Sequence, residues 1–356
     1  MSTEDNPFDG VAGSLNAADA RLVETFGWYT VAKKEFRDAV RSMGLWLLTV
    51  VFISIFIVPV ALALYFDFNV VTRGGQSLGM QLLISQFYLN IVTVMVPIIA
   101  IFVGYASISK ERESGSLKLL LSLPNSRKDV IVGKVLGRCA VVCVPLVIAL
   151  GLGALFFAAS SVALKPALYA QFGLFTIAFT AVFVAIAVSI SGAFSSSITS
   201  AIASFAAYIY FTFAWNWVAN DGIGALLSQL GIEGSLRWHI ILGTKLLNPN
   251  QAYKTLTNAM LANGESGALS ARFGMFSQGG LLSPGLPAES LNTICGSVLG
   301  GSPAQQETAF GSARVVCNTG SGLPVYFSDP AVFVYMLLWI GVAAAISYYT
   351  FNLADL

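Results

Sequence analysis

The sequence predicts an all-α polytopic membrane protein with six transmembrane helices, an N-terminal interfacial amphipathic helix and a large external loop between spans five and six. Its 356 residues are 56% hydrophobic and only 10% charged, and the mean hydropathy is +0.75. Soluble domains carry about 25% charged residues, so this composition indicates a protein of the bilayer. Six apolar runs are each long enough to cross about 30 Å of hydrocarbon as a helix of about 20 residues.

The six apolar runs set the expected domain boundaries. They occupy residues 44–66, 87–108, 135–158, 169–190, 199–218 and 331–351. Runs four and five are separated only by 191–198 and could form one very long helix. We interpret them as two antiparallel spans, because a single helix would far exceed the bilayer thickness. We therefore expect spans one to five within 44–218, an extracytoplasmic loop domain over 219–330, and span six with a short C-terminal segment over 331–356.

The segment before the first span divides into two parts. Residues 1–20 are polar and acidic without an early apolar core, so we expect a flexible tail and no cleavable signal peptide. In residues 21–43, Phe36, Ala39, Val40 and Met43 recur at helical spacing, with charged side chains on other faces. This pattern predicts an amphipathic helix at the membrane interface. A soluble extension of the first span is the alternative.

The distribution of Lys and Arg predicts the orientation, because these residues gather in cytoplasmic loops near span ends. The N-terminal segment and the loop after the second span hold twelve of the 19 basic residues. They are Arg21, Lys33, Lys34, Arg37, Arg41, Lys110, Arg112, Lys118, Arg127, Lys128, Lys134 and Arg138. We therefore expect a multi-pass plasma-membrane protein with both termini in the cytoplasm and residues 219–330 outside.

The external region 219–330 is rich in Gly, Ser, Asn and Pro. Helical patterns occur at 226–230 and 240–261, and the part after about Gly264 resembles loop. Cys295 and Cys317 both lie in this region, outside the reducing cytosol. A disulfide between them would close a loop of about twenty residues and contribute roughly 3 kcal/mol.

The segment 109–134 between spans two and three concentrates charge in a chain that has little. Leu117, Leu120 and Leu121 share one helical face, and Pro124 ends that helix. Ser126 and Asp129 then match a capping box that begins the next helix. An ordinary positive-inside loop is the alternative. However, such a loop needs neither an apolar face nor interspersed Glu, and both suit docking to a partner.

The residues of this segment also carry a family resemblance. The string from Glu111 to Arg127, with Val130, Gly133, Lys134 and Arg138, resembles the coupling segment of ABC-2-type permeases. These are the membrane subunits of ATP-binding-cassette exporters. Together with the segment 247–253, the string is similar to the permease subset associated with maturation of a periplasmic copper enzyme. Residues 264–330 depart from that subset, being longer and richer in Gly and Ser.

The resemblance implies that the coupling segment 109–134 contacts a cytosolic ATP-binding-cassette ATPase subunit, which would bind ATP and Mg. By position, the contact residues are Glu111, Arg112, Glu113, Ser114, Gly115, Leu117 and Lys118. The expected assembly is a homodimer in membrane lipid with two copies of the ATPase. We therefore expect a permease subunit that couples ATP hydrolysis by that separate subunit to substrate movement.

Other classes of function fit the sequence less well. The chain contains no complete phosphate-binding loop, so we expect no ATPase activity, no catalytic residues and no cofactor in this chain. Near the middle of the six spans there is no ionisable residue, which disfavours an ion-coupled transporter. His239 is the single histidine, and Cys139 with Cys143 suits packing better than a metal site. With a net charge of +1, nothing indicates nucleic-acid binding.

The second function class that we consider is a membrane-anchored interaction or signalling protein. Such a protein would display the 219–330 domain outside the cell and use the charged segment 109–134, on the cytosolic side, as a docking knob for a partner other than an ATPase.

Overall fold

The computed structural model describes residues 17, 19–65, 80–81, 83–116, 126–160, 162–261, 288–307, 313–319 and 324–353. Within these residues, six helical stretches are long and apolar enough to cross a membrane. They are Met43–Leu62, Leu89–Glu113, Lys128–Ala159, Pro166–Ala193, Ser197–Gln229 and Asp329–Thr350. The predicted fold class, an all-α polytopic membrane protein, is confirmed.

The third span, α9 (Arg127–Ala159), begins at the predicted capping box. The Ser126 side chain accepts a hydrogen bond from the Asp129 amide, and the Asp129 carboxylate accepts one from the Ser126 amide. Both otherwise unpaired amides of the first turn are thereby satisfied. The next span, α10 (Pro166–Ala193), begins with a proline at its first position, where the missing N–H costs no helical hydrogen bond.

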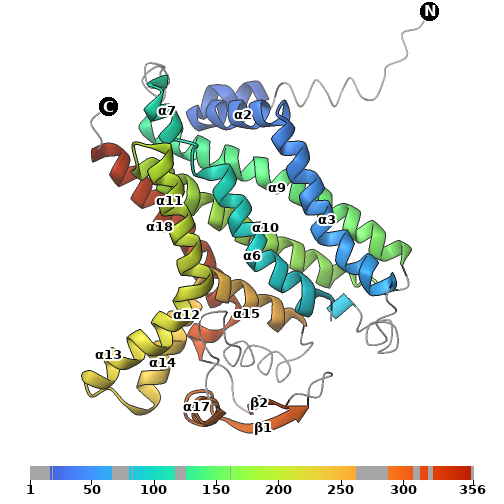
Figure 1. Ribbon diagram of the computed structural model, residues 1–356, viewed down its shortest axis with the longest axis vertical. Coiled ribbons are helices and arrows are strands. Elements are labelled where there is room, and N and C mark those ends of the chain that lie inside the picture. The colour runs from blue at the N-terminus through green and yellow to red at the C-terminus, as the bar shows by residue number, and fades with distance from the viewer. Residues whose placement is uncertain are drawn as a thin grey trace, which may run out of the picture.

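The central helix of the bundle is α10. Figure 1 shows α3 (Met43–Tyr65), α6 (Leu89–Gly104), α9, α11 (Ser197–Ile209) and α18 (Asp329–Leu353) arranged around it. Contacts join α10 to α6, α9, α11 and α18, and buried residues run along nearly its whole length. The first and last spans, α3 and α18, expose much more of their surface.

The predicted amphipathic segment forms α2 (Gly27–Val40), which lies across one end of the bundle against α9. Residues Arg41 and Ser42 are not helical, so α2 is a separate helix and not an extension of α3. Glycines on α9 allow its close approach. A Cβ added at Gly133 would lie 2.6 Å from the Trp28 carbonyl oxygen, and one at Gly137 would lie 2.8 Å from the Glu35 Cβ.

The fifth span continues past residue 218, where we expected it to end. After α11, the chain stays helical through two π-helical stretches (Tyr210–Ala214 and Val218–Gly222), α12 (Trp215–Trp217) and α13 (Ile223–Gln229). The polar side chains of Asn216, Asn220 and Asp221 lower the hydropathy there without interrupting the backbone hydrogen bonds. The helix of span five therefore extends into the expected loop domain, and the boundary of the membrane-spanning part at 218 stays a prediction.

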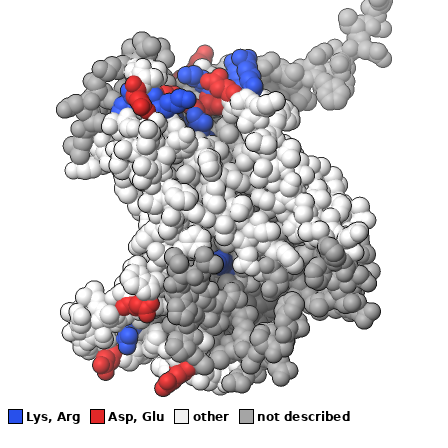
Figure 2. Space-filling view, viewed as in Figure 1, with Lys and Arg blue, Asp and Glu red and all other residues white. Residues whose placement is uncertain are grey.

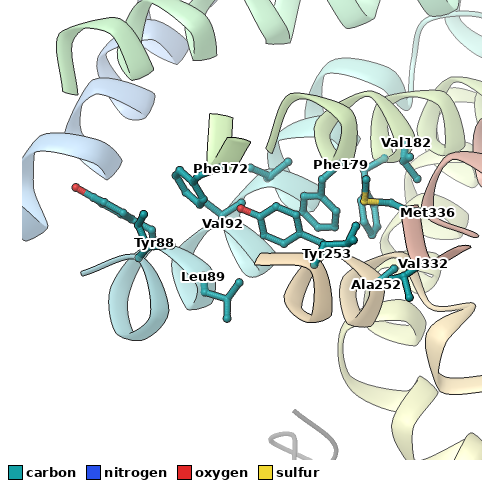
Figure 3. Packing of buried hydrophobic residues seen from close by; sticks show 14 of the residues in the cluster. Tyr88, Leu89, Val92, Phe172, Phe179, Val182, Ala252, Tyr253, Val332 and Met336 are labelled. Carbon is teal, nitrogen blue, oxygen red and sulfur yellow. The ribbon is translucent and has the colours of Figure 1, made fainter. Parts of the chain in front are cut away.

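Residues 219–330, which we expect to be external, contain the helices predicted from the first part of this region. They are α14 (Gly234–Leu246) and α15 (Pro249–Leu261). Helix α15 packs against α10 and α18 and adds to the core of the bundle. Figure 3 shows Tyr253 of α15 beside Phe179 of α10, with ring centroids 4.5 Å apart. The Tyr253 and Thr176 hydroxyls are 2.8 Å apart, so the buried Tyr253 hydroxyl has a hydrogen-bond partner.

The later part of the 219–330 region contains structure that the sequence did not predict. Strand β1 (Gly301–Glu307) pairs antiparallel with β2 (Ala313–Thr319), next to α17 (Ala288–Thr293) and a π-helical stretch (Ile294–Val298). The hairpin covers part of a region expected to be loop-rich; residues 262–287 lie outside the described residues. The structure joins Cys295 to Cys317, with a sulfur–sulfur distance of 1.98 Å, and both are buried.

Candidate docking site at the charged end

Most charged side chains of the described residues gather at one end of the bundle, and a smaller number lie at the opposite end (Figure 2). In Figure 2 the larger group covers the end formed by α2, α7 (Ser109–Glu113) and the start of α9, while the middle of this face is almost free of charge. The short helix α7 continues the second span after a turn at residues 105–108. It stops at Gly115, whose φ of +74° ends the helix in a conformation that favours glycine.

One side of α7 is tied to α2 and α9 by a buried ion-pair network. The Lys134 Nζ lies 2.7 Å from the Glu35 Oε1 and 2.8 Å from the Glu111 Oε1. Arg138 Nη2 lies 2.8 Å from the second oxygen of Glu35, Oε2. The exposed fraction of the side chain is 0% for Lys134, 9% for Glu35 and 23% for Glu111. Lys134 therefore joins α2, α7 and α9 at a single buried ammonium.

The electrostatics of this network favour the charged form of Glu35. Burial acts to raise the pKa of Glu35, but attraction by Lys134 and then Arg138 outweighs it, and the pKa of Glu35 is lowered overall. The Lys134 ammonium in turn needs both carboxylates, because a buried charge without a partner is costly. Loss of Lys134 would leave Glu35 with Arg138 alone and would remove the lysine that pairs with Glu111.

The other side of α7 is fastened to the connection between α10 and α11. The Ser191 hydroxyl oxygen lies 3.0 Å from the Ile108 amide and 3.1 Å from the Ser109 amide, and accepts from both. Arg112 donates to the Gly192 carbonyl oxygen over 3.1 Å. Glu113 accepts from the Ser197 amide and hydroxyl, which caps the start of α11. Thus α7 is held between two groups of spans.

The predicted contact residues divide into two sets in the structure. Glu111 and Arg112 are only half-exposed and bind other parts of this chain, while Glu113 is exposed but holds Ser197. Ser114, Gly115 and Ser116 are exposed, and a Cβ added at Gly115 would meet nothing within 4 Å. Leu117 and Lys118 lie outside the described residues. The free surface of the described part of the segment is thus its C-terminal turn, together with exposed Lys110.

The sequence analysis missed Glu35 as part of this site. The signal for it is weak: Glu35 follows Val31 by one helical turn on the face of α2 that packs on α9. A carboxylate at such a position requires a buried cation opposite. Lys134 and Arg138 were in the string that carried the family resemblance, but nothing in their spacing identified their partners.

The structure offers no alternative centre for chemistry within the described residues. There, no group of three or more His, Cys, Asp or Glu side chains is placed to hold a metal ion. Cys139 and Cys143 are half-buried thiols on α9, and the Cys139 sulfur contacts the Ala181 carbonyl oxygen at 3.8 Å. His239 lies 2.7 Å from the Tyr326 hydroxyl, a contact that joins α14 to the chain just before α18.

Comparisons with known proteins agree with the resemblance noted above. The family model described as "ABC-2 family transporter protein" matches residues 29–356. The probable ABC transporter permease protein NosY of Pseudomonas aeruginosa is 28% identical over 127 residues. That alignment covers 36% of this chain and 44% of the relative, so this chain matches less than half the length of that protein.

Proposed function

Because this chain belongs to the ABC-2 family of transporter proteins, we propose that it is the transmembrane permease subunit of an ATP-binding-cassette exporter. A separate cytosolic subunit binds ATP and Mg, hydrolyses the nucleotide and moves the spans through contact with this chain. The observation that carries the proposal is the position of α7. The turn that follows this helix is exposed, and the helix itself is bonded to the rest of the bundle on two sides.

The bonding of α7 supports a role in transmitting movement. A force on Ser114–Ser116 passes through Glu111 and Lys134 to α2 and α9. The same force passes through Ser191, Gly192 and Ser197 to α10 and α11. A loose surface loop would absorb such a displacement, whereas a segment bonded on both sides transfers it to two groups of spans.

The orientation follows from the positive-inside rule. The end of the bundle with α2 and α7 carries most of the basic residues and faces the cytoplasm. Span six ends on the same side, so both termini are cytoplasmic, and α13, α14 and the β-hairpin lie outside the plasma membrane. This orientation puts the exposed turn of α7 in the compartment that contains ATP.

A homodimer is supported by an apolar stripe on span five. Ile198, Ile202, Phe205 and Ile209 recur every three or four residues along α11, and all four side chains are exposed. That spacing gives one continuous face. A second copy of the chain covers this face, and each copy binds one ATPase subunit.

Cross-linking combined with copurification tests the proposal. The native thiols Cys139 and Cys143 are replaced by Ala, and Ser116→Cys is introduced in the exposed turn. Ser228→Cys, an exposed serine in α13 at the other end of the molecule, is the matched control. We expect an ATP-binding-cassette ATPase to copurify at one copy per chain and to cross-link to the first variant only.

The same experiment separates the exporter from a membrane-anchored interaction protein. Copurification of a partner that binds no nucleotide, or cross-linking of the ATPase through Ser228→Cys, would refute the assignment of α7 as the coupling contact.

A further inference from the structure

A cavity of about 580 Å³ lies where α2, α3, α6, α7 and α9 meet. This volume falls within the range of about 300–1,000 Å³ that is typical of small-molecule sites. The cavity is separate from the exposed turn of α7, although Glu111 lines it. Because α3 and α6 both pack on α9, α9 forms the common wall between them.

The wall of the cavity on the bilayer side is apolar. It is formed by Leu45, Leu48 and Val51 of α3, Ile99 and Val103 of α6, and Val141 of α9. Leu47 and Phe102, which also line it, expose 67% and 74% of their surface. Since both belong to membrane spans, these faces are in contact with lipid, and an apolar chain can enter the cavity sideways from the bilayer.

The rim at the charged end is polar and carries both signs of charge. It consists of Lys34, Glu35 and Asp38 of α2, Glu111 of α7 and Arg138 of α9. Both carboxylate oxygens of Glu35 already form ion pairs, one with Lys134 and the other with Arg138. Glu111 Oε2 and Arg138 Nε have no hydrogen-bond partner among the described residues. The rim thus retains hydrogen-bonding capacity on a cationic side chain and on an anionic one.

A ligand for this cavity must be amphipathic and must carry both charges in its polar part. A phosphate accepts hydrogen bonds from Lys34 and Arg138, and a primary ammonium donates to Asp38 and Glu111. An anionic head without an amine, such as phosphatidylglycerol, has no ammonium for the carboxylates, and a phosphatidylserine head adds a third charge, a carboxylate, to a rim that has two cations and three carboxylates. A choline head has no N–H to donate, so it leaves the carboxylates without hydrogen bonds.

We propose that this cavity binds one phospholipid with a zwitterionic, primary-amine headgroup, of the phosphatidylethanolamine class. The acyl chains lie against α3, α6 and α9, and the headgroup lies between α2 and α7. The bound lipid would brace the Lys134 network from its open side. The proposal requires only that the chain spans a bilayer, so it stands even if the ATPase partner proposed above is wrong.

Native mass spectrometry of the purified, delipidated protein tests this site. The probes are phosphatidylethanolamine, phosphatidylcholine and phosphatidylglycerol with identical acyl chains, each added over a range of concentrations. We expect one phosphatidylethanolamine per chain, bound at least about tenfold more tightly than the other two, because those lack two or more charge-assisted hydrogen bonds.

Two variants and a matched control locate the binding. The double variant Lys34→Gln, Asp38→Asn removes one cation and one anion from the rim. The control Asp19→Asn, Lys33→Gln removes an ion pair of the same type, and neither residue lines the cavity. We expect the rim variant to lose about tenfold in affinity for phosphatidylethanolamine and the control to bind as the parent protein does. Leu48→Trp, which fills the cavity, should reduce binding of every lipid.

Three outcomes would overturn the proposal. Equal retention of the three lipids would indicate ordinary annular lipid. Equal loss in the rim variant and the control would place the binding elsewhere. A lipid-free dimer that cross-links through Leu47→Cys would identify a second copy of the chain as the occupant of the cavity.

Discussion

Replacing Lys134 by Met tests whether the buried ammonium holds the charged end together. Methionine retains an unbranched chain of similar length and removes the charge. Among the described residues, the change leaves Glu35 with Arg138 only, at 2.8 Å, and removes the one ion-pair partner of Glu111. Removing one member of a buried ion pair costs roughly 3–5 kcal/mol. Because Arg138 still compensates Glu35 and Glu111 is partly solvated, we expect about 3 kcal/mol.

This loss should be measurable as a fall in the midpoint of heat denaturation of the purified protein in detergent. At about 2–4 °C per kcal/mol for domains of 150–250 residues, 3 kcal/mol corresponds to a fall of roughly 6–12 °C. Lys128→Met is the matched control, because Lys128 is an exposed lysine in the first turn of the same helix. The cost of the control should be within about 0.5 kcal/mol.

A second variant distinguishes loss of the charge network from loss of packing. Adding Glu111→Gln to Lys134→Met removes the carboxylate that the single change leaves without its lysine, while Glu35 stays paired with Arg138. Since removing an uncompensated charge lifts the penalty of its burial, the double variant should recover part of the loss. The ion-pair account is wrong if Lys134→Met is no less stable than Lys128→Met, or if the double variant is less stable than Lys134→Met.

Three further predictions concern other parts of the chain. The pKa of Glu35 is lowered from its usual 4.5. The ionised Glu35 therefore stabilises the fold fully above pH 4.5, and this stabilisation is lost as the pH falls through the lowered pKa. The midpoint of heat denaturation, measured between pH 7 and 3, should fall at acid pH, and it should fall less in Glu35→Gln. Gly137→Ala should destabilise the α2–α9 contact by about 1–3 kcal/mol, because its Cβ would lie 2.8 Å from the Glu35 Cβ, whereas Gly151→Ala, with nothing within 4 Å, should be tolerated in the same heat-denaturation assay. Peptide mapping by mass spectrometry without reductant should find Cys295 linked to Cys317 in protein taken from the membrane; recovery of both as free thiols would contradict the pairing.

The structure also changes how the coupling contact should be tested. Glu111 and Glu113 are two of the contact residues predicted from the sequence, so reversing their charges would be the obvious test of the coupling contact. Both side chains have partners in this chain, at Lys134 and Ser197. Their reversal therefore alters the bundle as well as any contact with a partner. Changes at exposed Ser114 and Ser116 probe the docking surface without that complication.

The parts of the fold that follow from local physics could be predicted from the sequence. Span number follows from runs of apolar residues, and the start of α9 follows from Ser126 and Asp129 three residues apart. Helices α14 and α15 follow from apolar spacing and from the proline at the start of α15. The β-hairpin could not be predicted, because its Gly, Pro and Gln residues do not alternate between apolar and polar.

The candidate site depends on contacts between residues far apart in the sequence, which a local pattern cannot give. Glu35 and Lys134 are separated by 99 residues, and Arg112 and Gly192 by 80. The sequence drew attention to this segment because its charge is unusual in this chain. It did not reveal that Glu111, Arg112 and Glu113 are largely occupied by contacts within the protein.

These contacts within the protein determine how a movement of α7 would reach the spans. A helix bonded on one side only could tilt on its own when a partner pushes it, and the spans would not follow. Helix α7 is bonded on one side to α2 and α9 by buried charges, which are expensive to separate. On its other side it is bonded to the α10–α11 connection by hydrogen bonds to Ser191, Gly192 and Ser197. Of these two sets of bonds, the hydrogen bonds to the exposed Ser197 cost less to break. Movement of α7 should therefore carry α2 and α9 with it as one unit and change the angle between that unit and α11, the span whose exposed apolar face we assign to the second copy.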